Sequence, residues 1–196
     1  MRLSAPQVGV LAFLLAIAAG AVLLSLPASG ASGRSLAIVD AVFMAVSAVC
    51  ITGLSVIEPG SDLSLFGQVV LLLLIKAGGF GVVTLGVLIA LATGRRVGVR
   101  ARLGSSLAHS PMQVGGVVRL LRNVFLFITA MELAATVLLF IRFRGFEMEN
   151  PAYMALFHAV SGFNHAGLSL FPGSLQRFGG DPVILLSLAA LIVLSG

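Results

Sequence analysis

Long and short apolar runs alternate along this chain. Residues 8–26, 65–93 and 124–141 are each close to the ~20 residues that cross a bilayer as a helix, so they predict three membrane spans. Residues 40–49 are too few to cross but are long enough for a half-helix that enters the membrane from one side. The pattern therefore predicts a membrane protein built from crossing helices and shorter inserted ones.

Turn and cap residues separate the apolar runs. Residues 58–62 form a polar turn that returns the chain to the surface from which the first half-helix starts. Asn150 followed by Pro151 suits the start of a second half-helix, because a capping side chain precedes proline at the first helical position. Asp181 and Pro182 begin a further span in the same way.

Two twelve-residue stretches repeat each other. FMAVSAVCITGL at residues 43–54 and FHAVSGFNHAGL at residues 157–168 share Phe, Ala, Val, Ser, Gly and Leu at six matched positions, 114 residues apart. Each runs through about two helical turns and then reaches a glycine that no continuing helix follows. Each is interpreted as a re-entrant pore helix followed by a selectivity-filter strand, so the chain reads as helix, pore loop, helix, repeated in parallel.

This organisation predicts the fold class and its divisions. We expect an all-α membrane protein of repeated helix, pore loop, helix units with re-entrant half-helices, as in potassium-channel-like pores. The first repeat covers residues 1–93, a basic linker covers residues 94–118, and the second repeat covers residues 119–196. Because residues 183–196 are too few to cross a bilayer, we expect an N-terminal fragment of a longer protein.

Composition and charge support a membrane protein and give its orientation. The chain is 59% hydrophobic and 10% charged, values that exclude an ordinary soluble domain. Its net charge of +5 comes from arginines beside apolar spans rather than in an aromatic-rich patch, which argues against nucleic acid as a partner. Seven of the twelve cationic residues fall at the N-terminus or between residues 95 and 122, so the positive-inside rule places both regions in the cytoplasm and the pore loops outside.

The first apolar run has an alternative interpretation. Arg2 followed by residues 8–26 could be a secretory signal peptide, although this run exceeds the typical apolar region of ~7 to 15 residues. A single cysteine, Cys50, excludes an internal disulfide.

The two glycines of the repeat are the candidate site. A dehydrated potassium ion needs oxygen ligands in place of its water shell, and backbone carbonyls can supply them. Gly53 and Gly167 allow the backbone angles that such a carbonyl row requires. The predicted ion-binding residues are Cys50, Ile51, Thr52, Gly53, Asn164, His165, Ala166 and Gly167. The structural alternative is that each glycine merely caps a short helix.

Ionisable and flexible positions at membrane depth suggest further roles. Lys76 could line the pore or limit ion passage, or it could form a buried ion pair with Glu132. Gly78, Gly79 and Gly81 could act as a gating hinge or allow close packing of helices.

A hydrolase is a further alternative. His158 and Ser161 would share a helix face, the spacing that a serine nucleophile and its base would need. The matching Ser47 has no histidine three residues before it, and no oxyanion site or zinc-type ligand set accompanies either serine. We therefore expect no enzyme activity.

Three segments resemble a known family. SAVCITGL, LFGQVVLLLLIKAGGFGVVTLG and FHAVSGFNHAGLSLF are similar to the pore segments and following helix of the Trk/Ktr/HKT superfamily of potassium transporters, and most like its Ktr-type membrane subunits. The resemblance implies potassium uptake across the cytoplasmic membrane by a pore-forming subunit that has four such repeats in one polypeptide. It also implies a homodimer in the lipid bilayer with a cytoplasmic nucleotide-binding regulatory subunit, and no cofactor beyond the transported potassium.

The filter residues sharpen what this resemblance implies. Glycine at both filter positions implies preference for potassium, since serine at the first is the family variation associated with sodium. His165 departs from the family, whose second filter usually reads Asn-Asn-Ala-Gly. A different interpretation is that the 196 residues alone form a truncated, non-conducting assembly fragment, because two filter segments do not surround an ion.

Overall fold

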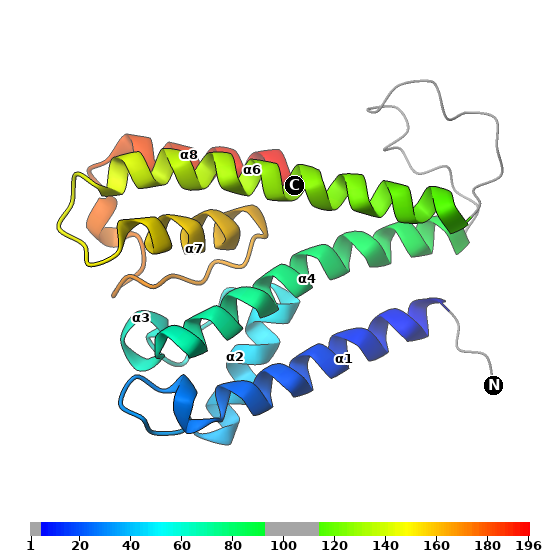
Figure 1. Cartoon of the computed structure of the whole chain (residues 1–196), viewed down its shortest axis with the longest axis horizontal. Helices are drawn as coiled ribbons and strands as arrows, with labels where there is room; N and C mark the ends of the chain where they lie inside the picture. Colours follow the sequence, from blue (N-terminus) through cyan, green and yellow to red (C-terminus); the bar gives the residue numbers. More distant parts are fainter. Residues whose placement is uncertain (1–4, 93–113) are drawn as a thin grey trace.

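The computed structural model describes residues 5–92 and 114–196 (Figure 1). The described chain is helical, with one isolated antiparallel β-bridge between Gly30 and Leu63. Its helices are α1 (Ala5–Leu24), η1 (Pro27–Ser29), α2 (Ile38–Cys50), α3 (Pro59–Asp62), α4 (Leu65–Ala92), α6 (Val114–Phe143), α7 (Pro151–Phe163), η3 (Gln176–Phe178) and α8 (Pro182–Ser195).

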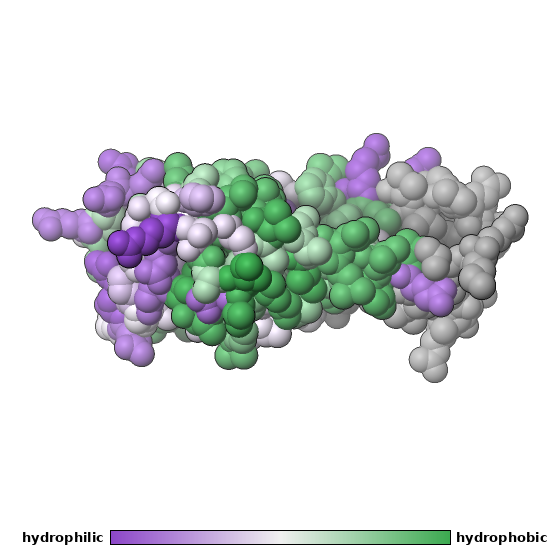
Figure 2. Space-filling model, turned by 90° about the horizontal axis from the view of Figure 1, so that it is seen from below, coloured by the Kyte–Doolittle hydropathy of each residue, from purple (hydrophilic) through white to green (hydrophobic). Residues whose placement is uncertain are grey.

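Three described helices are long and apolar enough to cross a membrane. Their qualifying segments are Gln7–Leu24 in α1, Leu65–Thr84 in α4 and Arg119–Phe143 in α6, which agree with the three predicted spans. Figure 2 shows a broad hydrophobic band with a large group of hydrophilic residues at one end of the molecule and a few more toward the other. The predicted all-α membrane architecture is confirmed.

The helix α6 begins within the range expected for the linker. α6 begins at Val114, five residues before the expected start of the second repeat at residue 119. The remainder of the predicted basic linker, residues 94–113, lies outside the described residues, as do four of the six arginines between residues 95 and 122 on which the cytoplasmic placement depends.

The two short apolar helices α2 and α7 have 13 residues each. Asn150 caps α7 as predicted, since its side chain accepts a hydrogen bond from the Tyr153 N–H and Pro151 occupies the first turn. α2 has no side-chain cap, and Asp40 lies in its first turn, where a carboxylate favours the positive end of the helix dipole. Both helices end beside the middle of α4 (Figure 1).

The hydrophobic core joins the repeats. One cluster unites α1, α2 and α4, and it also takes in Leu168 and Leu170, which follow α7. A second cluster lies between α6, α7 and α8. Gly60 in α3 lies so close to Leu170 that a methyl group on Gly60 would be 1.9 Å from the Leu170 carbonyl oxygen. The segment after α7 is therefore packed into the first repeat.

Candidate functional site

The backbone takes the same path after both short helices. Ile51 and His165 have φ angles of 58° and 57°, and the glycines two residues later, Gly53 and Gly167, have φ angles of 73° and 66°. Glycine adopts positive φ without a steric penalty, whereas a β-branched residue such as Ile51 does so rarely. The matched residues therefore form two copies of one local structure, which we name the first filter segment (residues 50–54) and the second filter segment (residues 164–168).

The glycines are not the helix caps that the structural alternative requires. The left-handed residue that closes α2 is Ile51, whose N–H bonds to the Ser47 carbonyl. Gly53 lies two residues further on, and Gly167 lies beyond Asn164, the residue that caps α7. Their positive φ angles belong to the non-helical segments themselves.

One part of the sequence prediction needs correction. Cys50 was expected in an extended strand, but it is the last residue of α2. The last helical turn encloses Cys50 because the Ile51 N–H bonds to the Ser47 carbonyl. Ile51 and His165 are left-handed rather than extended. Each segment is therefore an irregular loop in which the glycine lies two residues after a left-handed residue.

A buried serine holds each filter segment to its helix. The Ser47 hydroxyl donates to the Leu54 carbonyl at 2.6 Å, and the Ser161 hydroxyl donates to the Leu168 carbonyl at the same distance. The sequence pattern suggested no role for these serines other than that of a nucleophile. The signal that could have found them is that serine is one of the six residues shared by the two stretches.

The two glycines lie side by side. A methyl group on Gly53 would lie 3.1 Å from the carbonyl oxygen of Ala166 and 3.5 Å from Cα of Gly167. A methyl group on Gly167 would lie 3.3 Å from Cα of Gly53. Contacts this short leave little space for a side chain at either position, so the fold brings residues 114 positions apart into direct contact.

Charged and polar side chains brace the second filter segment. Lys76 of α4 forms an ion pair with one carboxylate oxygen of Glu132 in α6, which confirms the predicted pair. The other Glu132 oxygen accepts a hydrogen bond from the Asn164 side-chain amide at 2.8 Å. The same amide donates to the Val160 carbonyl, also at 2.8 Å. The counter-charge and the hydrogen bond offset the free-energy cost of burying the Glu132 carboxylate. The network also joins α4, α6 and the end of α7.

The glycines of α4 receive the ends of both short helices. A methyl group on Gly78 would lie 2.3 Å from the carbonyl oxygen of Val49 in α2, and one on Gly79 would lie 2.0 Å from the Asn164 side chain. Gly81 faces an aromatic ring of α1 in the same way. α4 continues as a helix through all three, which supports the close-packing interpretation. A gating role for Lys76 and these glycines stays a prediction.

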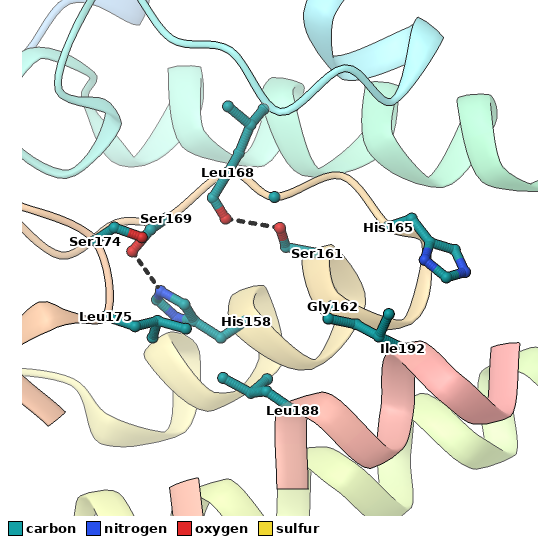
Figure 3. Close-up of a pocket in the computed structure, with 11 residues that line it drawn as sticks. His158, Ser161, Gly162, His165, Leu168, Ser169, Ser174, Leu175, Leu188 and Ile192 are labelled. Carbon is teal, nitrogen blue, oxygen red and sulfur yellow. Dashed lines mark hydrogen bonds between the residues drawn. The ribbon is translucent and has the colours of Figure 1, made fainter. Parts of the chain in front are cut away.

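His158 and Ser161 do not form a catalytic pair. Figure 3 shows each reaching the loop after α7 through a separate bond. The His158 Nε2 atom lies 2.9 Å from the Ser169 hydroxyl, and its Nδ1 atom lies 2.7 Å from the Met154 carbonyl, while Ser161 bonds to Leu168. They line a cavity of about 310 Å³ between α7, α8 and this loop.

The last features of the site are the contact of His165 with α8 and the lack of a metal-ligand cluster among the described residues. The His165 Nε2 atom lies 3.0 Å from the Ser195 hydroxyl near the end of α8, so this side chain is directed toward α8. Among the described residues, no group of three or more His, Cys, Asp and Glu side chains could hold a metal ion.

Known proteins are similar to this chain over nearly its whole length. Residues 4–196 match the TrkH cation transport protein family. The Ktr system potassium uptake protein B of Bacillus subtilis (strain 168) is 39% identical over 197 residues, covering 100% of this chain and 44% of the relative. The Ktr system potassium uptake protein B of Vibrio alginolyticus is 34% identical over 193 residues, covering 97% of this chain and 42% of the relative.

A third relative carries a broader name. The potassium/sodium uptake protein NtpJ of Enterococcus hirae is 30% identical over 196 residues, covering 100% of this chain and 44% of that protein. The chain thus spans less than half the length of these relatives. The family description is that of a transporter rather than an enzyme. Its match over nearly the whole sequence, together with the three apolar spans, makes this chain a multi-pass membrane protein of the TrkH cation transport family.

Proposed function

We propose that this chain forms part of the pore of a potassium uptake protein, in which the two filter segments coordinate the ion through backbone carbonyls. The observation that carries the proposal is the direct contact of Gly53 and Gly167, each with a positive φ, after helices of equal length. Carbonyl oxygens can replace the water shell of potassium. The carboxyl ends of α2 and α7 add a negative dipole end that favours a cation.

The names of the relatives support potassium as the transported ion. Two are potassium uptake proteins and one is a potassium/sodium uptake protein. Glycine at both filter positions supports a preference for potassium over sodium in this chain. The proposed ligands are the carbonyls of residues 50–53 and 164–167, with the helix-ending Cys50 and Asn164 at the inner limit of each row.

The remainder of the pore is proposed to come from outside these residues. Because Gly53 and Gly167 are in contact, the two filter segments make neighbouring sides of a ring rather than opposite ones. The relatives are more than twice as long as this chain, which leaves length for two further repeats. We therefore propose that this chain supplies two of four filter segments around one ion path.

Membrane orientation and partners follow from the same proposal. The protein would lie in the cytoplasmic membrane with its N-terminus and residues 94–118 inside and the starts of α2 and α7 outside, as the distribution of arginines favours. Two relatives are named as parts of a Ktr system. A homodimer and a cytoplasmic nucleotide-binding subunit are the proposed partners.

Growth of cells that lack their own potassium uptake systems tests this proposal. The complete gene that encodes this chain should restore growth at low external potassium and should increase rubidium uptake, which reports the same pathway. A Gly53→Arg variant, detected in the membrane at wild-type amounts, is the matched control and should not restore growth. Wild-type protein that reaches the membrane without restoring growth or uptake would contradict the proposal.

The second candidate function is a non-conducting assembly fragment. The contact between the two glycines favours it for residues 1–196 alone, because two neighbouring segments do not enclose an ion. Purified residues 1–196 in liposomes should then show no potassium flux, and addition of the missing portion should restore it. Selective flux through the isolated 196 residues would contradict this candidate.

A further inference from the structure

We propose that Ser47 and Ser161 are positioning residues for ion selection, each acting as a clamp that fixes one filter segment on both sides of its glycine. This inference rests on the proposed function of the two segments as an ion filter. Neither serine would touch the ion. Each would act through the backbone carbonyls that do.

The first clamp uses both polar groups of one residue. The Ser47 carbonyl accepts the Thr52 N–H at 3.0 Å, and the Ser47 hydroxyl donates to the Leu54 carbonyl at 2.6 Å. Gly53 is therefore held between two residues that are both bonded to Ser47. A loop with positive φ and no strand partner has few other restraints, so these bonds fix the direction of its peptide groups.

The second clamp repeats the first in different surroundings. The Ser161 carbonyl accepts the Ala166 N–H at 2.8 Å, and its hydroxyl donates to the Leu168 carbonyl at 2.6 Å. Ser47 is a residue of α2, which packs against α1 and α4, whereas Ser161 lines the cavity beside α8. The same four-atom arrangement in two environments is not explained by the packing of either one alone.

The clamp also sets where the row of ion ligands ends. The Leu54 and Leu168 carbonyls point to a serine hydroxyl, so neither oxygen is directed at an ion on the glycine side of the segment. The row of available carbonyls therefore stops at Gly53 and Gly167. Both serines are buried, with 1% and 3% of their surface exposed, so water does not compete for these bonds.

The test measures selectivity rather than the amount of transport. In the complete protein, Ser47→Ala and Ser161→Ala should each lower the ratio of potassium to sodium uptake by about three- to tenfold, the value of one hydrogen bond. Ser47→Thr and Ser161→Thr retain a hydroxyl and should restore most of the ratio. A variant that only folds less well would lose both fluxes together and would keep the ratio.

Two other serines provide matched controls. The Ser25 hydroxyl, just after the end of α1, donates to the Ala21 carbonyl one turn earlier. The Ser187 hydroxyl, within α8, donates to the Val183 carbonyl one turn earlier. Ser25→Ala and Ser187→Ala remove the same chemical group away from the filter segments and should leave the ratio unchanged.

The outcomes separate this inference from the proposed function. An unchanged ratio in both alanine variants, in a wild type that takes up potassium, would overturn the clamp alone. Alanine variants and controls that lower the ratio equally would also overturn it. A wild type without potassium uptake would remove the proposed function and this inference with it.

Discussion

The two repeats share a backbone but differ in how their filter segments are fastened. Both have the left-handed residue, the glycine and the buried serine at matched positions. At three other matched positions the first repeat has an apolar or sulfur-containing residue where the second has a hydrogen-bonding one. The pairs are Met44 and His158, Cys50 and Asn164, and Ile51 and His165.

Each polar residue of the second repeat reaches a different partner. His158 bonds to Ser169, Asn164 to Glu132, and His165 to Ser195. In the first repeat, by contrast, Met44 only meets a serine hydroxyl through its sulfur.

The last matched residues of the two segments also differ in exposure. Leu54 in the first filter segment is 61% exposed, whereas Leu168 at the matched position is 3% exposed. The comparison teaches that glycine and serine accompany one shared local geometry, while the other residues that contact each segment differ. Substitutions can therefore test separately the residues that the two repeats share and the residues in which they differ.

The largest expected effect concerns the ion pair that joins α4 of the first repeat to α6 of the second. Lys76→Met leaves the buried carboxylate of Glu132 without its counter-charge, so we expect a loss of about 3 kcal/mol in the free energy of unfolding. Denaturant unfolding of the protein in detergent, followed by circular dichroism, measures it. Adding Glu132→Gln removes the charge and retains an oxygen for Asn164, so the double variant should recover most of the loss. A single variant as stable as the wild type would show that the pair contributes nothing.

The next effect should be equal in the two repeats. Gly53→Ala and Gly167→Ala place a methyl group in a backbone with positive φ, which costs about 1 to 2 kcal/mol, and also against the opposite segment. Each should lower potassium uptake at least about tenfold. Gly180→Ala is the control, since open space surrounds Gly180. Transport at the wild-type rate by either filter variant would break the equivalence of the repeats.

A smaller effect should distinguish the repeats at one matched position. Asn164→Ala removes the amide that bonds to Glu132 and Val160, so we expect a loss of about 1 to 3 kcal/mol in the free energy of unfolding. Cys50→Ala at the matched, exposed position should change it by less than about 0.5 kcal/mol. Thermal unfolding of both variants under one condition gives the comparison. Equal losses would mean that the hydrogen bonds of Asn164 do not stabilise the second repeat.

The smallest effect depends on pH and involves the helix that follows each filter segment. The Asp181 carboxylate caps α8 and accepts a 2.7 Å hydrogen bond from Arg142. Burial raises the pKa of Asp181, but the hydrogen bond from Arg142 and those from backbone N–H groups outweigh it and hold the pKa below 3.8. Ser64 precedes α4 and accepts from the Gly67 N–H without a charge.

The sign follows from the lowered pKa of the folded state. The stabilising contribution of Asp181 is present above the pKa of the unfolded chain and is lost as pH falls below 3.8. Amide hydrogen exchange, corrected for intrinsic rates, should therefore increase in the first turn of α8 between pH 5 and about pH 3 while the first turn of α4 changes less. Asp181→Asn should remove this difference, and a difference that persists in this variant would refute the assignment.

Local signals in the sequence predicted the elements. The Asn150 and Pro151 pair marked the start of α7, and the repeated glycines marked the non-helical segments that follow both short helices. Capping and positive φ depend on residues that are neighbours in sequence, so a pattern can show them. The ion pair of Lys76 and Glu132 was predictable because charges at membrane depth need partners.

Contacts between elements were not predictable in the same way. The hydroxyl of Ser47 reaches a carbonyl seven residues later only because Ile51 turns the chain back with a left-handed angle, which β-branched residues rarely adopt. Asn164 joins the ion pair because Gly79 leaves space for its side chain. Such contacts depend on how α4, α6 and α7 pack, and no local pattern contains that information.

The absence of a side chain at Gly60 has a mechanical consequence. The short helix α3 rests directly on the Leu170 carbonyl, where even a methyl group would not fit. The segments that follow the first and the second filter segment are therefore in direct contact near the hydrophilic end of the molecule. A displacement of either segment at this contact must therefore displace the other.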